Sequence, residues 1–560
     1  MSEKASEDSL TTIAEVTAQP LNETDGKRKE VVLQDQAIRL PLHRLLLIYF
    51  GIGLALFLSF LDQTSVSTAA PVIGGDIGGS DSISWLGTAF LVANCAMHLV
   101  YGRLSDIFGR KQMLQVALLF LGVGNLLCGF AKTPVQLYVF RAISGLGGGG
   151  VNGIAMTVVS DVVSLKDRGK YQGLISAACS LGSAVGPFVG GGLATAGQWR
   201  WLFWMSCPLS VLIIIGTHYI LPLKPVTGSV KVKLLQIDYM GIVLSAGATV
   251  LLLVPISGGG STFPWHSPEV IALLVVGAVM MIAFLGCEWK FARLPILPLR
   301  LFKTPTVSIV LAQSFLVGVI YYGNIFYVPM FFQYVKGYSA LKSGALVLAY
   351  TLPQSVWGIL SGQIISRTNQ YKAVIIFGSA IWTLGAGLQI MWTPDWSLGK
   401  LIGVLEISSI GVGCCLQSTL VAMMAVAPDK DRAVITSSRN FFRTIGGAFG
   451  LAVANAIFNN TVSSELPAAL TAEKKDEILR STISFMGDLS AQLQIEVILA
   501  YAHGLRTCYI VFTAGSGVCF LLSLFIKEVI FRKDPPELKR KPQDDTVALE
   551  EQAAAPVPRT

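Results

Sequence analysis

Long apolar segments recur along the whole length of this chain, and they limit its fold more than any other feature. Hydrophobic residues make up 52% of the 560 residues and charged residues only 14%, well below the charged share of soluble domains. About 20 consecutive apolar residues are enough for a helix to cross a bilayer. We therefore predict an all-α polytopic membrane protein with fourteen transmembrane helices. The predicted spans are 45–66, 84–101, 113–131, 137–160, 171–195, 201–222, 237–257, 269–289, 306–332, 343–366, 372–392, 400–427, 433–458 and 507–531.

The spacing of these spans predicts two six-helix bundles separated by an inserted helix pair. Because the inserted pair lacks charged residues within the membrane, we expect it at the periphery of the protein. Polar residues dominate both ends of the chain, which we expect to be cytoplasmic tails, the first of them disordered. The predicted parts are the tail 1–44, the N-terminal bundle 45–222, inserted helices 7 and 8 at 237–289, the C-terminal bundle 306–531 with its outer loop 459–505, and the tail 532–560.

The distribution of lysine and arginine predicts the orientation of the chain. If the N-terminus lies inside, the short inner loops carry most of the loop cations and the outer loops carry few, as expected when cations are retained in the cytoplasm. Both termini are then cytoplasmic, and loop 459–505 faces outward with a glycosylation sequon at Asn459. We expect a monomer in the plasma membrane, with the vacuolar membrane as the alternative.

Several classes of function are disfavoured by composition and by missing motifs. The formal net charge is +8, but the cations are spread over loops and tails, so we expect the lipid bilayer and not nucleic acid as a partner. The sequence contains no GxxxxGK[ST] phosphate loop and no His, Cys and carboxylate cluster with metal or nucleophile spacing. We therefore expect no cofactor, no metal and no enzymatic activity.

A short, highly charged turn lies between two apolar segments at Gly102 to Lys111. Its cations favour the cytoplasmic side, its glycines let helix ends close tightly, and its aspartate can form a charge network that rearranges as helices move. Asp161 ends a later span on the same side, within reach of Arg110. An ordinary positive-inside loop would explain the cations but neither the glycines nor the aspartate. We expect a cytoplasmic latch that holds an outward-facing state and consists of Gly102, Arg103, Asp106, Gly109, Arg110 and Asp161.

Two opposite charges fall inside predicted spans. Asp62 is a carboxylate in an apolar segment, and such residues are functional candidates by default because they are costly in a membrane. At about 1.5 Å per residue, Asp62 lies in the outer half of the bilayer, and Arg141 on the span 137–160 reaches an overlapping depth. We expect the two to pair, which lowers the cost of both charges. The pair then serves proton coupling or gating; the alternative is a purely structural ion pair.

Small residues four apart occur on the span 171–195, which also contains a proline. The set is Gly182, Gly186, Pro187 and Gly190. Glycines at this spacing allow close contact between helices, and the proline removes a backbone donor and bends the helix. We expect this helix to act as a pivot or seal where the bundles meet, and simple close packing would give the same pattern.

Polar and aromatic residues within the C-terminal bundle are candidates for the lining of a substrate cavity. On the span 306–332 and just after it, a group of aromatic and amide side chains offers such a lining without formal charge. Glu406 is a further intramembrane candidate. Arg439 and Arg443 begin the span 433–458, and we expect them at the cytoplasmic rim. The predicted cavity residues are Tyr321, Tyr322, Asn324, Tyr327, Gln333 and Glu406.

Taken together, these motifs resemble the fourteen-span drug:proton antiporter branch of the major facilitator superfamily, including fungal multidrug and toxin efflux pumps. The matching segments are Leu61-Asp62-x-Thr64 with Ala70-Pro71, Gly102 to Lys111, Arg141 with Gly145, Gly186-Pro187, Trp199-Arg200-Trp201 and Phe332 to Ser339. The resemblance implies proton coupling by Asp62 and Arg141, a latch of Asp106 with Arg103 and Arg110, and an antiport role for Gly186 and Pro187.

The expected function is therefore proton-coupled efflux of hydrophobic or amphipathic small molecules, such as drugs and fungal toxins, by alternating access. Its partners would be a small-molecule substrate and protons. Two alternatives stay open. The first is a siderophore transporter or a vacuolar transporter of basic amino acids with the same fold, and the second is a non-transporting membrane sensor.

Overall fold

The computed structural model describes residues 42–78, 85–163, 168–221, 226, 229–258, 264–292, 294–428, 431–467, 470–471, 474–475 and 490–529. The predicted tail 532–560, almost all of the tail 1–44 and part of the loop 459–505 lie outside these residues. Every regular element in the described ranges is a helix, so the predicted all-α fold is confirmed.

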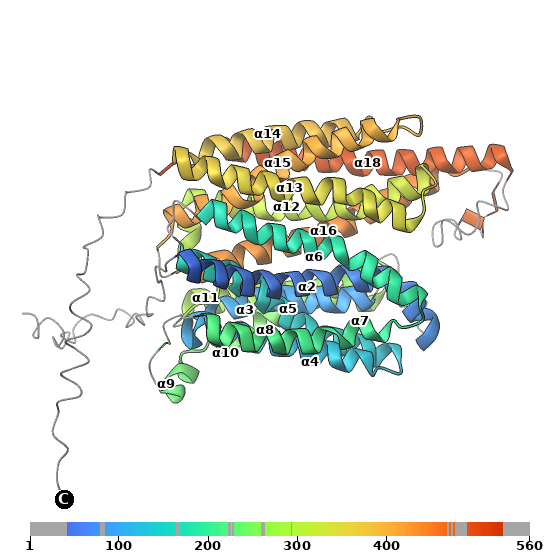
Figure 1. Cartoon of the computed structure of the whole chain (residues 1–560). Helices are drawn as coiled ribbons and strands as arrows, with labels where there is room; N and C mark the ends of the chain where they lie inside the picture. The colour runs from blue at the N-terminus through green and yellow to red at the C-terminus, as the bar shows by residue number, and fades with distance from the viewer. Residues whose placement is uncertain are drawn as a thin grey trace, which may run out of the picture.

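The helices form two bundles, which lie one above the other in Figure 1. The N-terminal bundle contains α2 (Leu42–Ile77), α3 (Trp85–Phe108), α4 (Arg110–Gly129), α5 (Pro134–Val162), α6 (Arg168–Thr195) and a broken helix made of α7 (Arg200–Trp204) and α8 (Ser206–Ile220). The C-terminal bundle contains α12 (Pro305–Met330), which continues as η3 (Phe331–Val335), and α13 (Ala340–Thr368), α14 (Tyr371–Gln389), α15 (Leu398–Val426), α16 (Arg432–Glu465) and α18 (Ala491–Leu524). Between them come α9 (Val230–Leu235), the inserted pair α10 (Tyr239–Gly258) and α11 (Pro268–Lys290), and η2 (Leu299–Lys303).

Thirteen helices in the described residues are long and apolar enough to cross a membrane. The predicted span missing from that set is α13, because polar side chains such as Thr351, Gln354 and Ser355 are spread along it. These three side chains are buried, and α13 packs between α6 and α15. With its 29 residues, α13 completes the fourteen spans.

Local sequence signals set several helix boundaries. Thr133 caps α5: its hydroxyl accepts a hydrogen bond from the backbone N of Gln136 at 3.3 Å, and Pro134 occupies the first turn. Ser267 and Pro268 start α11 in the same way. Between α3 and α4, Gly109 has a φ of 105°, a conformation that favours glycine. This residue therefore allows two spans to be joined by a one-residue break.

Several predicted boundaries are wrong. The helix α2 continues to Ile77 and α3 to Phe108, beyond the predicted ends at 66 and 101. The helices α16 and α18 also extend beyond their purely apolar segments. The helix α16 continues to Glu465 and α18 starts at Ala491, whereas we predicted an end at 458 and a start at 507. The added turns pack on each other, since the rings of Phe458 and Tyr501 stack with centroids 6.0 Å apart. Burial of aromatic side chains therefore extends the two helices into the predicted outer loop.

Each bundle has its own apolar core. Leucine, isoleucine and valine side chains fill the N-terminal core, among them Leu56, Leu118 and Val158, which are fully buried. The C-terminal core is richer in aromatic residues: the rings of Phe331 and Trp392 lie 4.9 Å apart between centroids. These cores allow each bundle to move as a unit, while a smaller cluster that includes Leu99, Leu253 and Phe441 joins α3, α10 and α16.

The bundles meet through α6 against α13 and through α3 against α16. The closest approaches lie toward one end of the molecule, the end that carries Arg103 and Arg110, which we call the motif end. There a Cβ on Gly102 would overlap the side chain of Ser437, and a Cβ on Gly173 would lie 2.6 Å from the Cα of Ile359. Glycine is thus required at both places for the helices to approach this closely.

The inserted pair is less peripheral than we expected. The helix α11 contacts α10 and has many exposed apolar residues, which suits a position facing lipid. By contrast, α10 packs against both α3 of the N-terminal bundle and α16 of the C-terminal bundle. The insertion therefore covers the junction between the two bundles on one side.

Candidate functional site

Asp62 on α2 and Arg141 on α5 form a buried ion pair. The Arg141 Nη1 donates a hydrogen bond to Asp62 Oδ2 at 2.8 Å, and each side chain is only 1% exposed. The second oxygen, Asp62 Oδ1, has no hydrogen-bond partner within the described part of the chain. The carboxylate therefore keeps one acceptor atom that a proton can occupy.

The guanidinium of Arg141 is held by several further groups. Its Nη1 also donates to Asn125 Oδ1 at 3.2 Å, and its Nε donates to the carbonyl of Leu86 at 3.3 Å. The ring of Phe90 lies 4.5 Å from the guanidinium carbon, which adds a cation–π contact. Arg141 is thus fixed in position even when its contact with Asp62 weakens.

The glycines of α6 lie directly against the part of α2 that carries Asp62. A Cβ on Gly182 would lie 2.5 Å from the carbonyl of Phe57, and a Cβ on Gly186 would overlap the Thr64 hydroxyl and lie 3.0 Å from the Leu61 carbonyl. One turn further, Gly190 meets the backbone of Ser65 in the same way. Pro187 lies within α6 beside this contact. The predicted motif therefore sets how closely α6 supports the helix of the ion pair.

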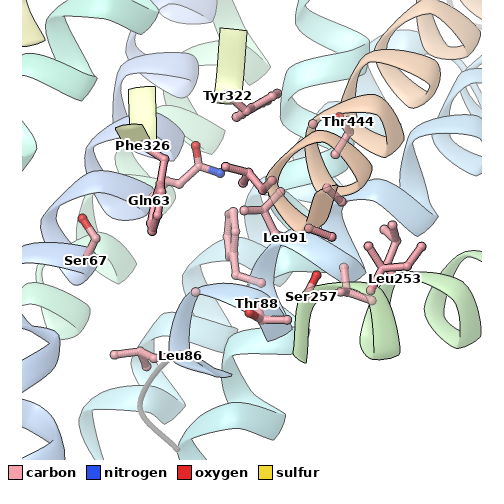
Figure 2. Close-up of a pocket in the computed structure, with 18 of the residues that line it drawn as sticks. Gln63, Ser67, Leu86, Thr88, Leu91, Leu253, Ser257, Tyr322, Phe326 and Thr444 are labelled. Carbon is pink, nitrogen blue, oxygen red and sulfur yellow. The ribbon is translucent and has the colours of Figure 1, made fainter. Parts of the chain in front are cut away.

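A cavity of about 620 Å³ lies between the two bundles. Figure 2 shows Gln63 beside Phe326, with Leu253 and Ser257 of α10 on the opposite side of the group. Arg141 lines the cavity, and no aspartate or glutamate among the described residues does so. The other polar lining residues are Gln63, Ser67, Thr88, Ser257, Tyr322, Tyr327, Thr444 and Asn455. The site is therefore mainly apolar, with one formal positive charge.

The structure places two of the six predicted substrate-cavity residues along this cavity. Tyr322 and Tyr327 on α12 line the cavity, and Phe326 lies between them on the same face. The other four predicted residues, Tyr321, Asn324, Gln333 and Glu406, do not line it. On a helix, positions 321 and 324 point away from the face shared by 322 and 326. Asn324 is fully buried, Gln333 lies on η3 beyond α12, and Glu406 lies on α15, which contributes no lining residue.

Sequence reasoning missed the lining residues outside α12. Gln63, Ser67 and Ala70 lie along one face of α2, and Thr444, Ala448 and Asn455 lie along one face of α16. Polar residues repeated at helical spacing within an apolar span were the available signal. The contribution of Leu253 and Ser257 had no such signal, because nothing in the sequence places α10 beside the cavity.

The predicted latch residues form a connected set of buried charges at the motif end. Arg110 Nη2 lies 2.7 Å from Asp106 Oδ1, and Arg110 Nε lies 3.0 Å from Asp161 Oδ2. Arg103 Nη1 lies 3.2 Å from Asp106 Oδ2. The structure thus brings together the two arginines and both carboxylates. Gly102 contacts α16, and Gly109 forms the break between α3 and α4.

The latch also contacts the segment that follows the inserted pair. Arg103 Nε donates a hydrogen bond to the carbonyl of Pro295 at 2.9 Å. The next residue, Ile296, donates from its backbone N to Glu288 Oε1 on α11 at 3.0 Å. These two hydrogen bonds therefore connect the motif end of α3 to the last turn of α11, the second helix of the inserted pair.

Two arginines of α16 lie deeper than predicted. Arg439 and Arg443 follow Arg432, the first residue of α16, by seven and eleven positions, or roughly 10 and 17 Å along the axis. Arg439 is buried, and its Nη2 donates to Thr419 Oγ1 at 3.3 Å and to the carbonyl of Leu416. The expectation that they lie at the rim is therefore wrong, because they follow the start of α16 by about two and three turns.

The predicted glycosylation residue lies within a helix. Asn459 belongs to α16, six positions before its last residue, Glu465, and its side chain is partly buried. Its Nδ2 donates to Asn455 Oδ1 at 3.3 Å. The assignment of Asn459 to an outer loop is therefore wrong.

In the part of the chain that the structure describes, no three His, Cys, Asp or Glu residues gather as a metal site would require.

Two helical bundles that enclose a cavity, with a buried carboxylate–guanidinium pair at its wall, define a membrane transporter. The profile of the Major Facilitator Superfamily matches residues 52–451. The chain belongs to this superfamily and is a transporter rather than an enzyme. Citrate exporter 1 of Yarrowia lipolytica is 40% identical over 506 residues, which are 90% of this chain and 75% of that exporter. Efflux pump FUS6 of Gibberella moniliformis is 30% identical over 503 residues, 88% of this chain and 89% of the pump.

The fold is also seen in solved structures of transporters. The human organic anion transporter MFSD10 superposes with a TM-score of 0.56 at 15% identity, covering 86% of this chain and 100% of MFSD10. This likeness supports the fold alone. The expected similarity to fungal efflux pumps is confirmed by the relatives.

Proposed function

We propose that this protein is a proton-coupled exporter of hydrophobic or amphipathic small molecules that works by alternating access. The observation that carries the proposal is the Asp62–Arg141 pair, because Arg141 lines the cavity and its partner Asp62 can accept a proton. The names of two relatives, an efflux pump and a citrate exporter, support export as the direction.

The ion pair offers a direct way to connect protonation with the cavity. A proton that binds an oxygen of Asp62 cancels its negative charge and weakens the attraction to Arg141. Arg141 stays hydrogen-bonded to Asn125 and to the Leu86 carbonyl, so α2 is the helix released. The helix α2 packs on α6, and α6 packs on α13 of the other bundle. The release of α2 therefore alters the contact between the two bundles. Loss of the proton on the other side of the membrane restores the pair.

The charge cluster at the motif end fits a latch in this cycle. With both termini in the cytoplasm, the motif end is cytoplasmic and the cavity lies in the outer half. The close contacts at Gly102 and Gly173 then keep the inner side closed, and the network of Arg103, Asp106 and Arg110 stabilises this outward-facing state. We place the protein in the plasma membrane. No acidic side chain in the described part of the chain lines the cavity, which disfavours a transporter of basic amino acids.

Replacement of the proton acceptor tests this proposal. Cells with the native protein are expected to accumulate less of a panel of labelled hydrophobic compounds, and collapse of the proton gradient is expected to remove the difference. Asp62→Asn is expected to abolish gradient-dependent efflux. Asp76→Asn is a matched control, because Asp76 lies on the same helix and pairs with Arg200 but is 48% exposed. Gradient-dependent efflux by Asp62→Asn, at equal surface amounts, would show that the coupling role is wrong.

A further inference from the structure

Arg443 on α16 has no partner for its charge. Among the described residues, no hydrogen bond or ion pair reaches its side chain, and its Nε is buried without an acceptor. Arg439, one turn earlier, also has a buried Nε without an acceptor, but its Nη2 donates to the Leu416 carbonyl and the Thr419 hydroxyl. Arg443 is only partly buried, so its side chain reaches space within the protein.

The residues around Arg443 come from both bundles. It is within electrostatic range of His98 on α3, Cys179 on α6 and Tyr321 on α12. The next residue, Thr444, and Gly447 one turn further both line the cavity. Arg443 itself is not among the lining residues, so it lies at the interface of the bundles, next to the cavity and on its motif-end side.

Three other buried arginines each have a carboxylate partner, whereas Arg439, like Arg443, has none among the described residues. Arg141 pairs with Asp62, Arg103 with Asp106, and Arg110 with Asp106 and Asp161. A charge inside a membrane protein that lacks a counter-charge is costly, and it marks a site whose partner arrives from outside the chain. None of His98, Cys179 or Tyr321 carries a permanent negative charge that could serve.

We infer that Arg443 binds the anionic group of the substrate, so that the cavity takes an amphipathic organic acid. This inference narrows the substrate class of the proposed exporter and rests on that proposal. A carboxylate accepts two parallel hydrogen bonds from a guanidinium, a geometry that lysine cannot reproduce. The apolar part of the acid then lies along Tyr322, Phe326 and Leu253, and Arg141 supplies the positive charge of the cavity wall itself.

Binding of a matched acid and ester tests the inference. We would use 6-(7-nitrobenzofurazan-4-ylamino)hexanoic acid and its methyl ester, whose fluorescence rises in an apolar site. The full chain is placed in lipid nanodiscs, and empty nanodiscs give the background. The native protein is expected to bind the acid at least about tenfold more tightly than the ester, as charged hydrogen bonds allow.

Variants at Arg443 assign that preference to one residue. Arg443→Gln is expected to remove the preference for the acid and to leave ester binding within about twofold, which also shows that the variant is folded. Arg443→Lys is expected to keep part of the preference, because the charge remains. Arg506→Gln, at an exposed arginine of α18, a helix that contributes no lining residue, is the control and is expected to bind like the native protein.

Three results would overturn the inference: equal binding of acid and ester, equal weakening of both by Arg443→Gln, or no saturable binding of either probe. The measurement uses no proton gradient, so it is separate from the test of coupling. The two experiments can also give different answers. If the acid preference depends on Arg443 but efflux does not depend on the proton gradient, the proton-coupled function is refuted and the inferred substrate class is retained.

Discussion

Asp62 and Arg141 are each 1% exposed, so neither charge has water to replace a lost partner. Removing one member of such a pair leaves the other as an uncompensated buried charge. An exposed pair behaves differently, since water solvates whichever charge remains. The Asp76–Arg200 pair, with side chains 48% and 37% exposed, provides that comparison within the same bundle.

This difference in burial predicts different effects on stability. We expect Arg141→Gln to lower the free energy of unfolding by about 3–5 kcal/mol, and Arg200→Gln to change it by less than about 1 kcal/mol. Adding Asp62→Asn to Arg141→Gln is expected to recover part of the loss. Thermal unfolding of the purified variants in detergent measures all three. Similar losses for the buried and the exposed pair would contradict this account.

At the scale of elements, the glycines of α6 decide how closely α2 is supported. Gly186 faces the backbone of α2 next to Asp62, whereas Gly192 on the same helix has no atom within 4 Å of an added Cβ. Both positions lie on α6, but only Gly186 contacts a neighbouring helix. Alanine at the two positions therefore separates the effect of helix–helix contact on stability from the effect of helix propensity.

Alanine at these two positions should have opposite results. Gly186→Ala is expected to push α2 away and to destabilise the protein by about 1–3 kcal/mol, as overpacking does. Gly192→Ala is expected to be neutral or stabilising by up to about 1 kcal/mol, because alanine favours a helix over glycine. Unfolding midpoints of the two variants are compared with the native value. A neutral Gly186→Ala would mean that the helices can separate without cost.

Sequence could predict the elements and the charge pairs better than the cavity. The spans follow from long apolar segments, and the partners of Asp62 and Arg110 follow from depth along helices. The lining depends on how each helix is rotated, so Tyr322 could not be separated from Tyr321 by composition. The same holds for Arg443, whose depth depends on where α16 meets the membrane surface, and for α10, whose position depends on contacts with two bundles.

At the scale of the whole molecule, the two bundles are held together mainly where α6 packs on α13 and α3 packs on α16. Ser180 on α6 and Ser355 on α13 lie at the first of these contacts, because their hydroxyl groups are hydrogen-bonded to each other and both residues are buried. Alternating access requires the bundles to separate at this contact. A covalent bond there would prevent the movement.

A disulfide at this contact should stop transport reversibly. Ser180→Cys with Ser355→Cys is expected to cross-link under mild oxidation and to lose export, and reduction is expected to restore it. Peptide mass spectrometry identifies the bond. All nine native cysteines are free thiols, and one of them, Cys179, is next to Ser180. Ser355→Cys alone is therefore the control for a disulfide between position 355 and Cys179. Undiminished export by the cross-linked protein would show that this contact does not open.

The position of α10 has a consequence for how substrates can reach the cavity. Its buried face is made largely of small residues, including Gly241, Ser245, Ala248 and Thr249. Leu253 is the large exception, buried with Leu99 of α3 and Phe441 of α16. The small residues that make up the rest of this face would let one bundle slide along α10 while the other carries it. Through such a movement, α10 would keep that side of the cavity shielded from lipid. On this side, the substrate would then be exchanged only with the aqueous phases. A substrate that enters the cavity from within the bilayer would have to use another side of the molecule.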